Sequence, residues 1–463
     1  MVRFPKTYLS AMLLLLSVGA FAQSAGEQLS YRRSALAEAI IYHSEDTFGR
    51  NIQEAFESIP VSDKYDDHTI GIRVIDNDRI PDVRKNSHGL VKAKYGKTLN
   101  KEDIRLNGEM LERILNEANC AKWMVAKWFG WDLARIDSII HDTSLEKRER
   151  DSLLLTAATM NMRLIQQRGQ YNASDLDVQL AEHTARGVAA LSDAGEELIG
   201  NTFMLVNDIT YVTTEERAAV AKMTMNILGG VFDILTGGEV GRDVAKTGGQ
   251  VADLFTGFTV KTHSYLFQLQ WNDSIAAIFY NNYYSAVPDK DKIPAFLHDS
   301  TTFRMKYVAH EYEYDGKAEV KGKYDRHELV KMICTRSIDK NIAALQLAYE
   351  DFKVKTPVYE IVTNEKGKII GYSAKIGMKE GITEQSKFQV IERVIDPEKQ
   401  TSTYRHVADL RPVKGEIWDN RYNAVLEHAE DSELNATLFK KTGGGEILPG
   451  MLIIEGKYKK GTQ

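Results

Sequence analysis

One glycine-rich stretch lies between two strand-like runs, and this arrangement limits most strongly how the chain can fold. The first run covers residues 202–206 and continues over 209–212, and the second covers 259–271. Between them, Gly229 to Gly257 holds eight glycines in 29 residues. Because each interior glycine costs a helix about 1 kcal/mol relative to alanine, close packing must compensate if this stretch is helical. The pattern predicts two sheet strands joined by a long helical hairpin, residues 213–257.

Small residues recur at every fourth position inside this hairpin, at Gly237, Gly241, Ala245 and Gly249. A helix with that spacing has one smooth side on which another backbone can approach closely. Charged residues between these positions favour a soluble hairpin, while insertion into a bilayer and assembly into a ring are the alternatives. We therefore expect Gly237, Gly241 and Gly249 to form an interaction surface.

The N-terminus has the pattern of an export signal. Arg3 and Lys6 precede the apolar residues 11–22, which end in Ala20-Phe21-Ala22, a small-x-small cleavage site. A membrane span needs about 20 apolar residues, so a cleaved signal peptide, residues 1–22, is favoured over an anchor. We expect an exported protein that is periplasmic, outer-membrane-associated or extracellular.

The charge balance bears on the partners of the chain. The formal net charge is −6, whereas nucleic-acid binding needs a basic surface that neutralises phosphates. No later stretch reaches about 18 uninterrupted apolar residues. We expect no nucleic-acid partner and at most peripheral membrane contact.

Residue patterns predict three regions after the signal peptide. Residues 23–110 form an N-terminal α/β region, in which the 3.6-residue periodicity of 34–56 predicts a helix. Residues 111–353 form a helical and mixed α/β domain that contains the hairpin. From residue 354 to 463, two-residue alternation with turns predicts a barrel-like all-β module of five or six strands. The expected fold class is α+β.

Within these regions the same patterns predict individual elements. Helices are expected at 101–129, 143–165, 174–198 and 326–348, and strands at 69–75 and within 303–320. The polar residues 76–100 show no clear period and predict an exposed loop or short strands.

An aromatic group follows the second strand-like run: Trp271, Tyr280, Tyr283 and Tyr284. Aromatic rings can stack on sugars, and they more commonly pack in cores or interfaces. These four residues are therefore candidates for a glycan-binding surface in an exported protein.

The sequence contains none of the catalytic or cofactor motifs that we sought. His310-Glu311 lacks the second histidine of a zincin, and Lys441 precedes the glycines 443–445 where a phosphate loop needs it after them. An oxidising compartment permits a disulfide between Cys120 and Cys334, but both lie on or beside apolar helical stripes, which favours two separate buried thiols. We expect no enzyme activity, no cofactor and no metal.

The runs Leu164–Ser174 and Arg186–Asp208 resemble a family of uncharacterised exported proteins from Bacteroidota, and a signal peptide ending at Ala22 fits that source. At the level of pattern, the helix-then-strand order near residue 206 and the terminal module with Gly377, Gly381 and Phe388 are similar to envelope proteins of curli secretion and flagellar assembly. This second likeness implies a role in the cell envelope.

Three functions are compatible with these observations. The first is a non-catalytic envelope protein that binds or assembles with an envelope protein partner or a second copy. The second is a surface glycan-binding protein, and the third is a hydrolase with an unrecognised site. An exposed aromatic platform would favour the second, and a pocket joining a thiol or carboxylate to a histidine would favour the third.

Overall fold

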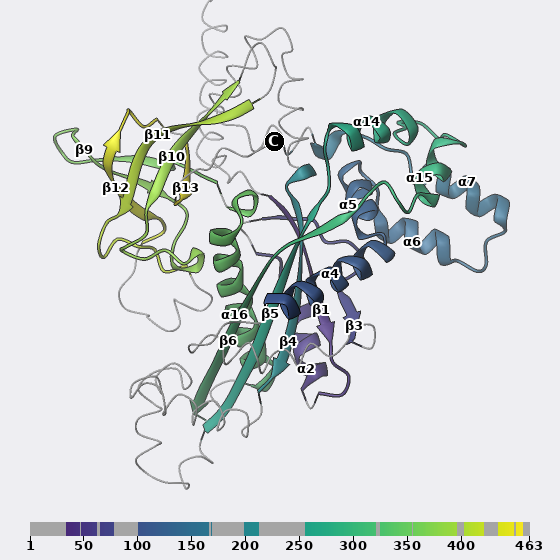
Figure 1. Cartoon of the computed structure of the whole chain (residues 1–463), viewed down its shortest axis with the longest axis horizontal. Helices are drawn as coiled ribbons and strands as arrows, with labels where there is room; N and C mark the ends of the chain where they lie inside the picture. Colours follow the sequence, from purple (N-terminus) through teal and green to yellow (C-terminus); the bar gives the residue numbers. More distant parts are fainter. Residues whose placement is uncertain are drawn as a thin grey trace, which may run out of the picture.

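The computed structural model describes residues 34–77 without 47 and 63–64, 101–165 and 168, 199–212, 255–320, 325–395 without 354, 402–420, 434–448, and 451–456. These residues form a six-stranded mixed sheet with helices on both faces, and a seven-stranded antiparallel sheet that curls into a half-barrel (Figure 1). The expected α+β class is confirmed.

The six-stranded sheet is built around the two strands that bracket the glycine-rich stretch. Its strands are β1 (Ala35–Tyr42), β2 (Asp66–Asp67), β3 (Val74–Asp76), β4 (Thr202–Tyr211), β5 (Phe255–Leu269) and β6 (Met305–Val320). The order is β2-β1-β4-β5-β6, and β3 also pairs with β1. β1 runs parallel to β4, whereas β4, β5 and β6 are antiparallel neighbours. The prediction that the bracketing strands belong to a sheet is confirmed, and they pair directly.

Two hydrophobic cores lie on opposite faces of this sheet. One face packs against α4 (Lys101–Glu117), α5 (Cys120–Trp128), α6 (Leu133–His141), α14 (Asp273–Asn282) and α15 (Lys292–His298), with α7 (Lys147–Ala157) beside α6. The other face packs against α2 (Gly49–Glu57) and α16 (Arg326–Ala348). Successive strand residues point to opposite faces, so Leu36 and Ile40 enter the α16 core while Ala37 and Ile41 enter the α4 core.

The helix predicted over 34–56 is wrong. The structure has strand β1 over Ala35–Tyr42 and begins helix α2 only at Gly49. Seven consecutive residues of β1 are buried, because helices cover both faces of the strand. A strand buried on both faces is a continuous apolar run, and such a run cannot be told from a helix by periodicity.

Several other expected elements are present with changed bounds. The helix predicted over 101–129 is divided at Asn119, whose φ of 55° is left-handed. The helix predicted over 143–165 is interrupted: Lys147–Ala157 form α7 and residues 163–165 are helical again, and α6 before it was not predicted. The strand predicted over 69–75 is reduced to β3. The strand prediction within 303–320 and the helix at 326–348 are confirmed.

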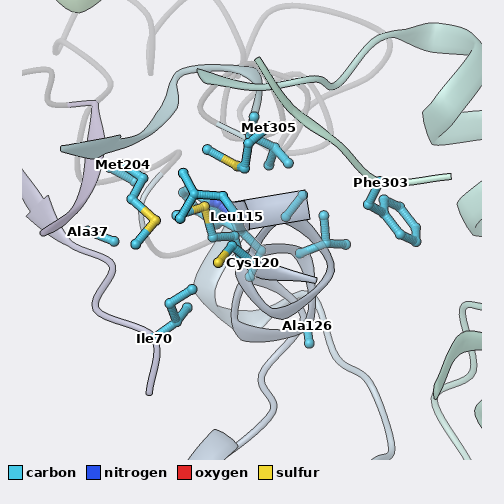
Figure 2. Packing of buried hydrophobic residues seen from close by; sticks show 14 of the residues in the cluster. Ala37, Ile70, Leu115, Cys120, Ala126, Met204, Phe303 and Met305 are labelled. Atoms are coloured by element: carbon cyan, nitrogen blue, oxygen red, sulfur yellow. The ribbon is translucent and has the colours of Figure 1, made fainter. Parts of the chain in front are cut away.

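The two cysteines are separate buried thiols, as predicted. Cys120 belongs to the α4 core, where Figure 2 places it near Leu115 and Met204, and Cys334 belongs to the α16 core. The six-stranded sheet therefore lies between them. Burial raises the pKa of the Cys120 thiol to about 12, so this thiol stays protonated at neutral pH.

Helix α4 caps the beginning of the edge strand β6 with side chains. The backbone N–H of Met305 donates to Asn116 Oδ1 at 2.8 Å, and Asn116 Nδ2 donates to the Met305 carbonyl at 3.0 Å. The backbone N–H of Tyr307 donates to Glu112 Oε2 at 2.8 Å. These side chains form hydrogen bonds with backbone groups that would otherwise be unpaired at the sheet edge.

The half-barrel is formed by the last quarter of the chain. Its strands are β7 (Thr356–Pro357), β8 (Glu360–Thr363), β9 (Ile369–Ala374), β10 (Phe388–Ile395), β11 (Ser402–Pro412), β12 (Thr437–Gly444) and β13 (Leu452–Glu455), in the order β7-β13-β10-β11-β12-β9-β8. Two 3-10 helices, η3 (Glu350–Phe352) and η4 (Met378–Glu380), complete the region. The sequence predicted five or six strands, and the structure has seven.

Several predicted features lie outside the described residues. These are the signal peptide 1–22, the helix 174–198, nearly all of the loop 76–100 and residues 213–254 of the hairpin. Among the helices that are described, none is long and apolar enough to cross a membrane.

We expect residues 354–463 to fold alone. Among the described residues, the buried apolar side chains of the main half-barrel core all come from between Val358 and Ile453, and none comes from the first sheet. Expression of 354–463 should give the far-UV circular dichroism of a β protein and dispersed amide signals. A disordered fragment would contradict the predicted boundary.

Candidate functional site

A row of polar residues, most of them buried, crosses the six-stranded sheet on the face that packs against α4. It contains the buried His43 directly after β1, Asp208 on β4 and His263 on β5, and the partly buried His310 on β6. Cross-strand pairing places Asp208 opposite His263, and Tyr265 opposite His310. Ionisable residues in a sheet interior are uncommon, so this row is the strongest candidate for a functional site among the described residues.

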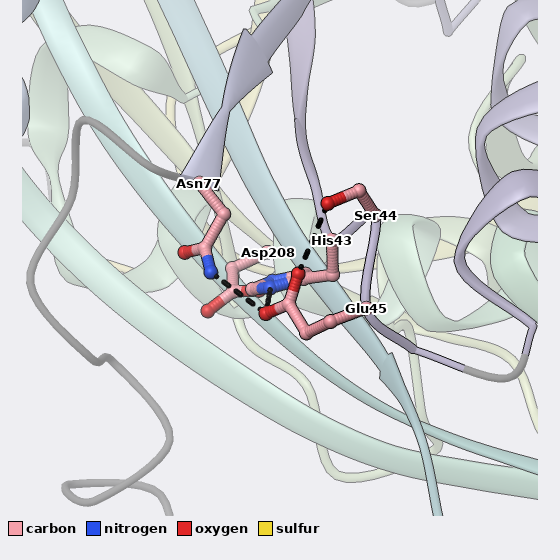
Figure 3. Close-up of polar contacts among 5 residues, drawn as sticks. All are labelled: His43, Ser44, Glu45, Asn77 and Asp208. Atoms are coloured by element: carbon pink, nitrogen blue, oxygen red, sulfur yellow. Dashed lines mark hydrogen bonds and ion pairs between the residues drawn. The ribbon is translucent and has the colours of Figure 1, made fainter.

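His43 and Asp208 form the closest contact of the row. His43 Nε2 lies 2.5 Å from Asp208 Oδ1, and the side chains are 2% and 3% exposed (Figure 3). Burial alone would raise the pKa of Asp208, but the hydrogen bond and positive charge of His43, with the charge of Lys261, hold that pKa below 3.8. Asp208 is therefore ionised, and the contact is a charge-assisted hydrogen bond.

A second carboxylate approaches His43 from the surface. Glu45 Oε1 lies 3.9 Å from His43 Nδ1, and the Glu45 side chain is 48% exposed. Asn77 Nδ2 donates to Glu45 Oε1 at 3.1 Å, and Ser44 Oγ donates to Glu45 Oε2 at 3.4 Å (Figure 3). The imidazole of His43 thus lies between a buried carboxylate, to which it is hydrogen-bonded, and an exposed carboxylate at ion-pair distance.

His263 and His310 form the other half of the row. His263 Nδ1 and His310 Nε2 are 3.0 Å apart, so one ring donates and the other accepts. Burial lowers the pKa of His263 to about 4, against the attraction of Asp208, and burial also holds the pKa of His310 well below 6.5. Both rings are neutral at pH 7. The ring of Tyr312 stacks on His263 with centroids 5.7 Å apart.

The geometry assigns this row a structural role more readily than a catalytic one. Within the described ranges, no group of three or more His, Cys, Asp or Glu side chains could hold a metal ion. The nearby Ser264 hydroxyl donates to Asn207 Oδ1 at 2.7 Å and accepts from Asn341 on α16, so it lies on the opposite face of the sheet. Since His43, Asp208 and His263 are at most 3% exposed, a substrate cannot reach them in this conformation.

The predicted aromatic group is brought together, and its rings pack on the protein itself. Trp271, Tyr280, Tyr283 and Tyr284 are partly buried against the α4 core. Their rings lie in edge-to-face and tilted contacts with each other and with Phe129, Phe279, Phe296 and Phe303, at centroid distances of 5.4–6.5 Å. Aromatic pairs of this kind stabilise a core. A sugar-binding role for these four residues stays a prediction.

The other predicted site residues, Gly237, Gly241 and Gly249, lie outside the described residues. Conversely, sequence reasoning did not predict the buried row. The only signal was an aspartate and a histidine inside otherwise apolar strand-like runs, at positions 208 and 263. Comparison with known proteins does not add to this picture, because no family model and no curated protein matches the chain.

We expect Asp208→Asn to lower the free energy of unfolding by about 3–5 kcal/mol, because removal of one partner leaves a buried charge uncompensated. Asp137→Asn is the matched control, since Asp137 forms an Asp–His contact with His141 in which both side chains are 74% exposed. That change should cost less than about 1 kcal/mol. Urea unfolding of both variants measures the difference, and equal costs would contradict a structural role for the row.

The neutral state of His263 predicts a pH effect. The unfolded chain takes up a proton near pH 6.5, whereas the folded protein does so only near pH 4, so protonation favours unfolding as the pH falls between these values. The free energy of unfolding of His263→Gln, relative to that of the parent, should therefore rise by up to about 3 kcal/mol as the pH falls from 7 to 4. The same substitution at the exposed His327 is the control. A stability difference for His263→Gln that does not change with pH would refute the assignment.

Proposed function

We propose that the protein is an exported, non-catalytic protein of the cell envelope that acts in binding or assembly. In this proposal the interacting part is the glycine-rich segment between β4 and β5, with Gly237, Gly241 and Gly249 on its contact surface. Its partner is an envelope protein or a second copy of the chain.

The observation that carries this proposal is a two-stranded arm that extends beyond the rest of the sheet. β5 pairs with β6 along its whole length, from Phe255 opposite Val320 to Leu269 opposite Met305. β4 accompanies β5 only as far as Tyr211 opposite Val260. The first residues of β5 and the last residues of β6 therefore form a ribbon of two strands, which Figure 1 shows projecting from the body.

The glycine-rich segment rejoins the sheet at the outer end of this arm. The chain leaves β4 after Tyr211 and returns to the sheet at Phe255, at the outer end of the arm. The β5 residues that enter the two cores lie between Val260 and Leu269. A two-stranded ribbon is at best marginally stable alone, so contacts made by the inserted segment or by a partner would stabilise it.

The alternatives receive less support from the geometry. Both thiols are fully buried, and the histidine and aspartate row is closed to substrates, which does not favour a hydrolase. The aromatic group uses its rings for internal packing, which does not favour a glycan platform. The envelope location rests on the N-terminal export pattern and on the pattern-level likeness to envelope assembly proteins.

We expect that replacing residues 213–254 with a short Gly-Ser linker abolishes assembly while the fold is retained. Every described strand of the sheet and every described residue of both cores lies outside the replaced residues, so thermal unfolding should remain cooperative. Sedimentation velocity measures self-association, and affinity capture from the native envelope measures partner binding. As a control, residues 421–433 between β11 and β12 are replaced in the same way, and this variant should assemble like the parent.

Single substitutions test the glycines that recur at every fourth position of the segment. Gly241→Leu and Gly249→Leu should reduce assembly, because a large side chain prevents close backbone approach. Gly71→Leu is the matched control, since nothing lies within 4 Å of a Cβ at that position. Unchanged assembly of both hairpin variants and of the linker variant would overturn the proposal.

A further inference from the structure

A second buried acid, Glu38, lies on the opposite face of the sheet, at its junction with the half-barrel. Glu38 is in the middle of β1, between Leu36 and Ile40, whose side chains enter the α16 core. It is 2% exposed, and the backbone N–H of Ser62 donates a hydrogen bond to it. Its carboxyl group is thus removed from water, beside apolar side chains of the α16 core.

Charged groups from three other elements surround Glu38. Asp339 comes from α16, Arg73 precedes β3, and Lys379 comes from η4 of the half-barrel. Lys379 Nζ lies 3.7 Å from Asp339 Oδ1, and both side chains are mostly buried. Glu380, the neighbour of Lys379, is 7% exposed. The junction therefore holds three carboxyl groups and two cations.

Tyr65 belongs to the same environment. Its hydroxyl donates to the Phe352 carbonyl at 3.3 Å, and its ring stacks on Phe352. Burial raises the pKa of Tyr65 well above 10, and the nearby Glu380 and Glu38 raise it further, against a hydrogen bond with Gln346. Tyr65 is therefore neutral at physiological pH and does not supply charge to the junction.

The element η4 is firmly part of the half-barrel and also contacts α16. Glu380 Oε2 accepts hydrogen bonds from the Gly377 backbone N–H at 2.5 Å and from Asn420 Nδ2 at 2.9 Å. A Cβ at Gly381 would lie 3.5 Å from the Cβ of Ala343 on α16. The contact between η4 and α16 thus joins the two sheets beside Glu38.

Ionisation of Glu38 is unfavourable while this junction is closed. Burial raises its pKa to about 7, and Asp339 contributes to the rise, while Arg73, the Ser62 N–H and Lys379 act against it. A hydrated glutamate ionises near pH 4.5. Any opening of the junction that brings water to Glu38 returns its pKa toward 4.5.

We propose that Glu38 makes the contact between η4 and α16 sensitive to pH, so that a protonated Glu38 keeps the half-barrel docked and an ionised Glu38 loosens it. The sign follows from proton binding: between pH 4.5 and pH 7 the closed junction holds a proton that the open junction has lost. Rising pH therefore favours the open junction. With a Glu38 pKa of about 7 in the closed junction and 4.5 in the open junction, the closed-to-open ratio falls by about tenfold between pH 6 and pH 8.

Amide hydrogen exchange in the full-length protein tests this proposal at η4. The Gly381 N–H donates to the Met378 carbonyl at 3.0 Å, so its protection reports whether η4 is ordered. After correction for the intrinsic pH dependence of exchange, protection of residues 378–382 should fall about tenfold from pH 6 to pH 8. Amides of β12 in the same half-barrel serve as the internal reference and should not change.

Three variants decide the outcome. Glu38→Gln cannot ionise and should keep η4 protected at both pH values, whereas Glu365→Gln, in the exposed turn between β8 and β9, should behave like the parent. Asp339→Asn removes a neighbouring negative charge and so lowers the pKa of Glu38 in the closed junction, and its protection should fall less between pH 6 and pH 8 than that of the parent. The proposal is overturned if Glu38→Gln retains the pH dependence, if the parent shows none, or if Asp339→Asn keeps the full tenfold fall of the parent.

Discussion

The structure depends on the position of β1 and β4 in the middle of the first sheet, where both faces of each strand must be covered. β4 has parallel β1 on one side and antiparallel β5 on the other, and nine of its ten residues are buried. A pair of strands buried on both faces needs two separate helical layers. Helices α4 to α6 with α14 and α15 supply one layer, and α2 with α16 supplies the other. The helices of these two layers come from the segments of the chain before, between and after the central strands.

The same constraint explains which elements the sequence predicts well. α16 is predicted with its observed bounds, because 23 residues carry a helical apolar pattern and the Asp325 side chain caps the first turn by accepting from the Glu328 N–H. The paired strands β4 and β5 are also predicted, because β-branched and aromatic residues dominate them. β1 is not predicted, because burial on both faces removes the alternation that identifies a strand.

The polar row could not be predicted, for a different reason. Asp208 and His43 are 165 residues apart, and only the parallel register of β1 and β4 brings them together. The register of an antiparallel pair likewise places Asp208 opposite His263. Local periodicity carries no information on such registers, so the residues that lie closest in the site are those whose proximity depends most on the complete fold. Glu38 illustrates the same point on the other face, since its neighbours come from three distant elements.

The side-chain cap that α4 places on β6 has a consequence for how copies of this protein can meet. A free sheet edge accepts a strand from another chain, and this is a common route to uncontrolled aggregation. Asn116 and Glu112 occupy backbone groups at the beginning of β6, so a foreign strand must first displace helix α4 before it can add there. The body of the protein thus resists growth by strand addition at this end.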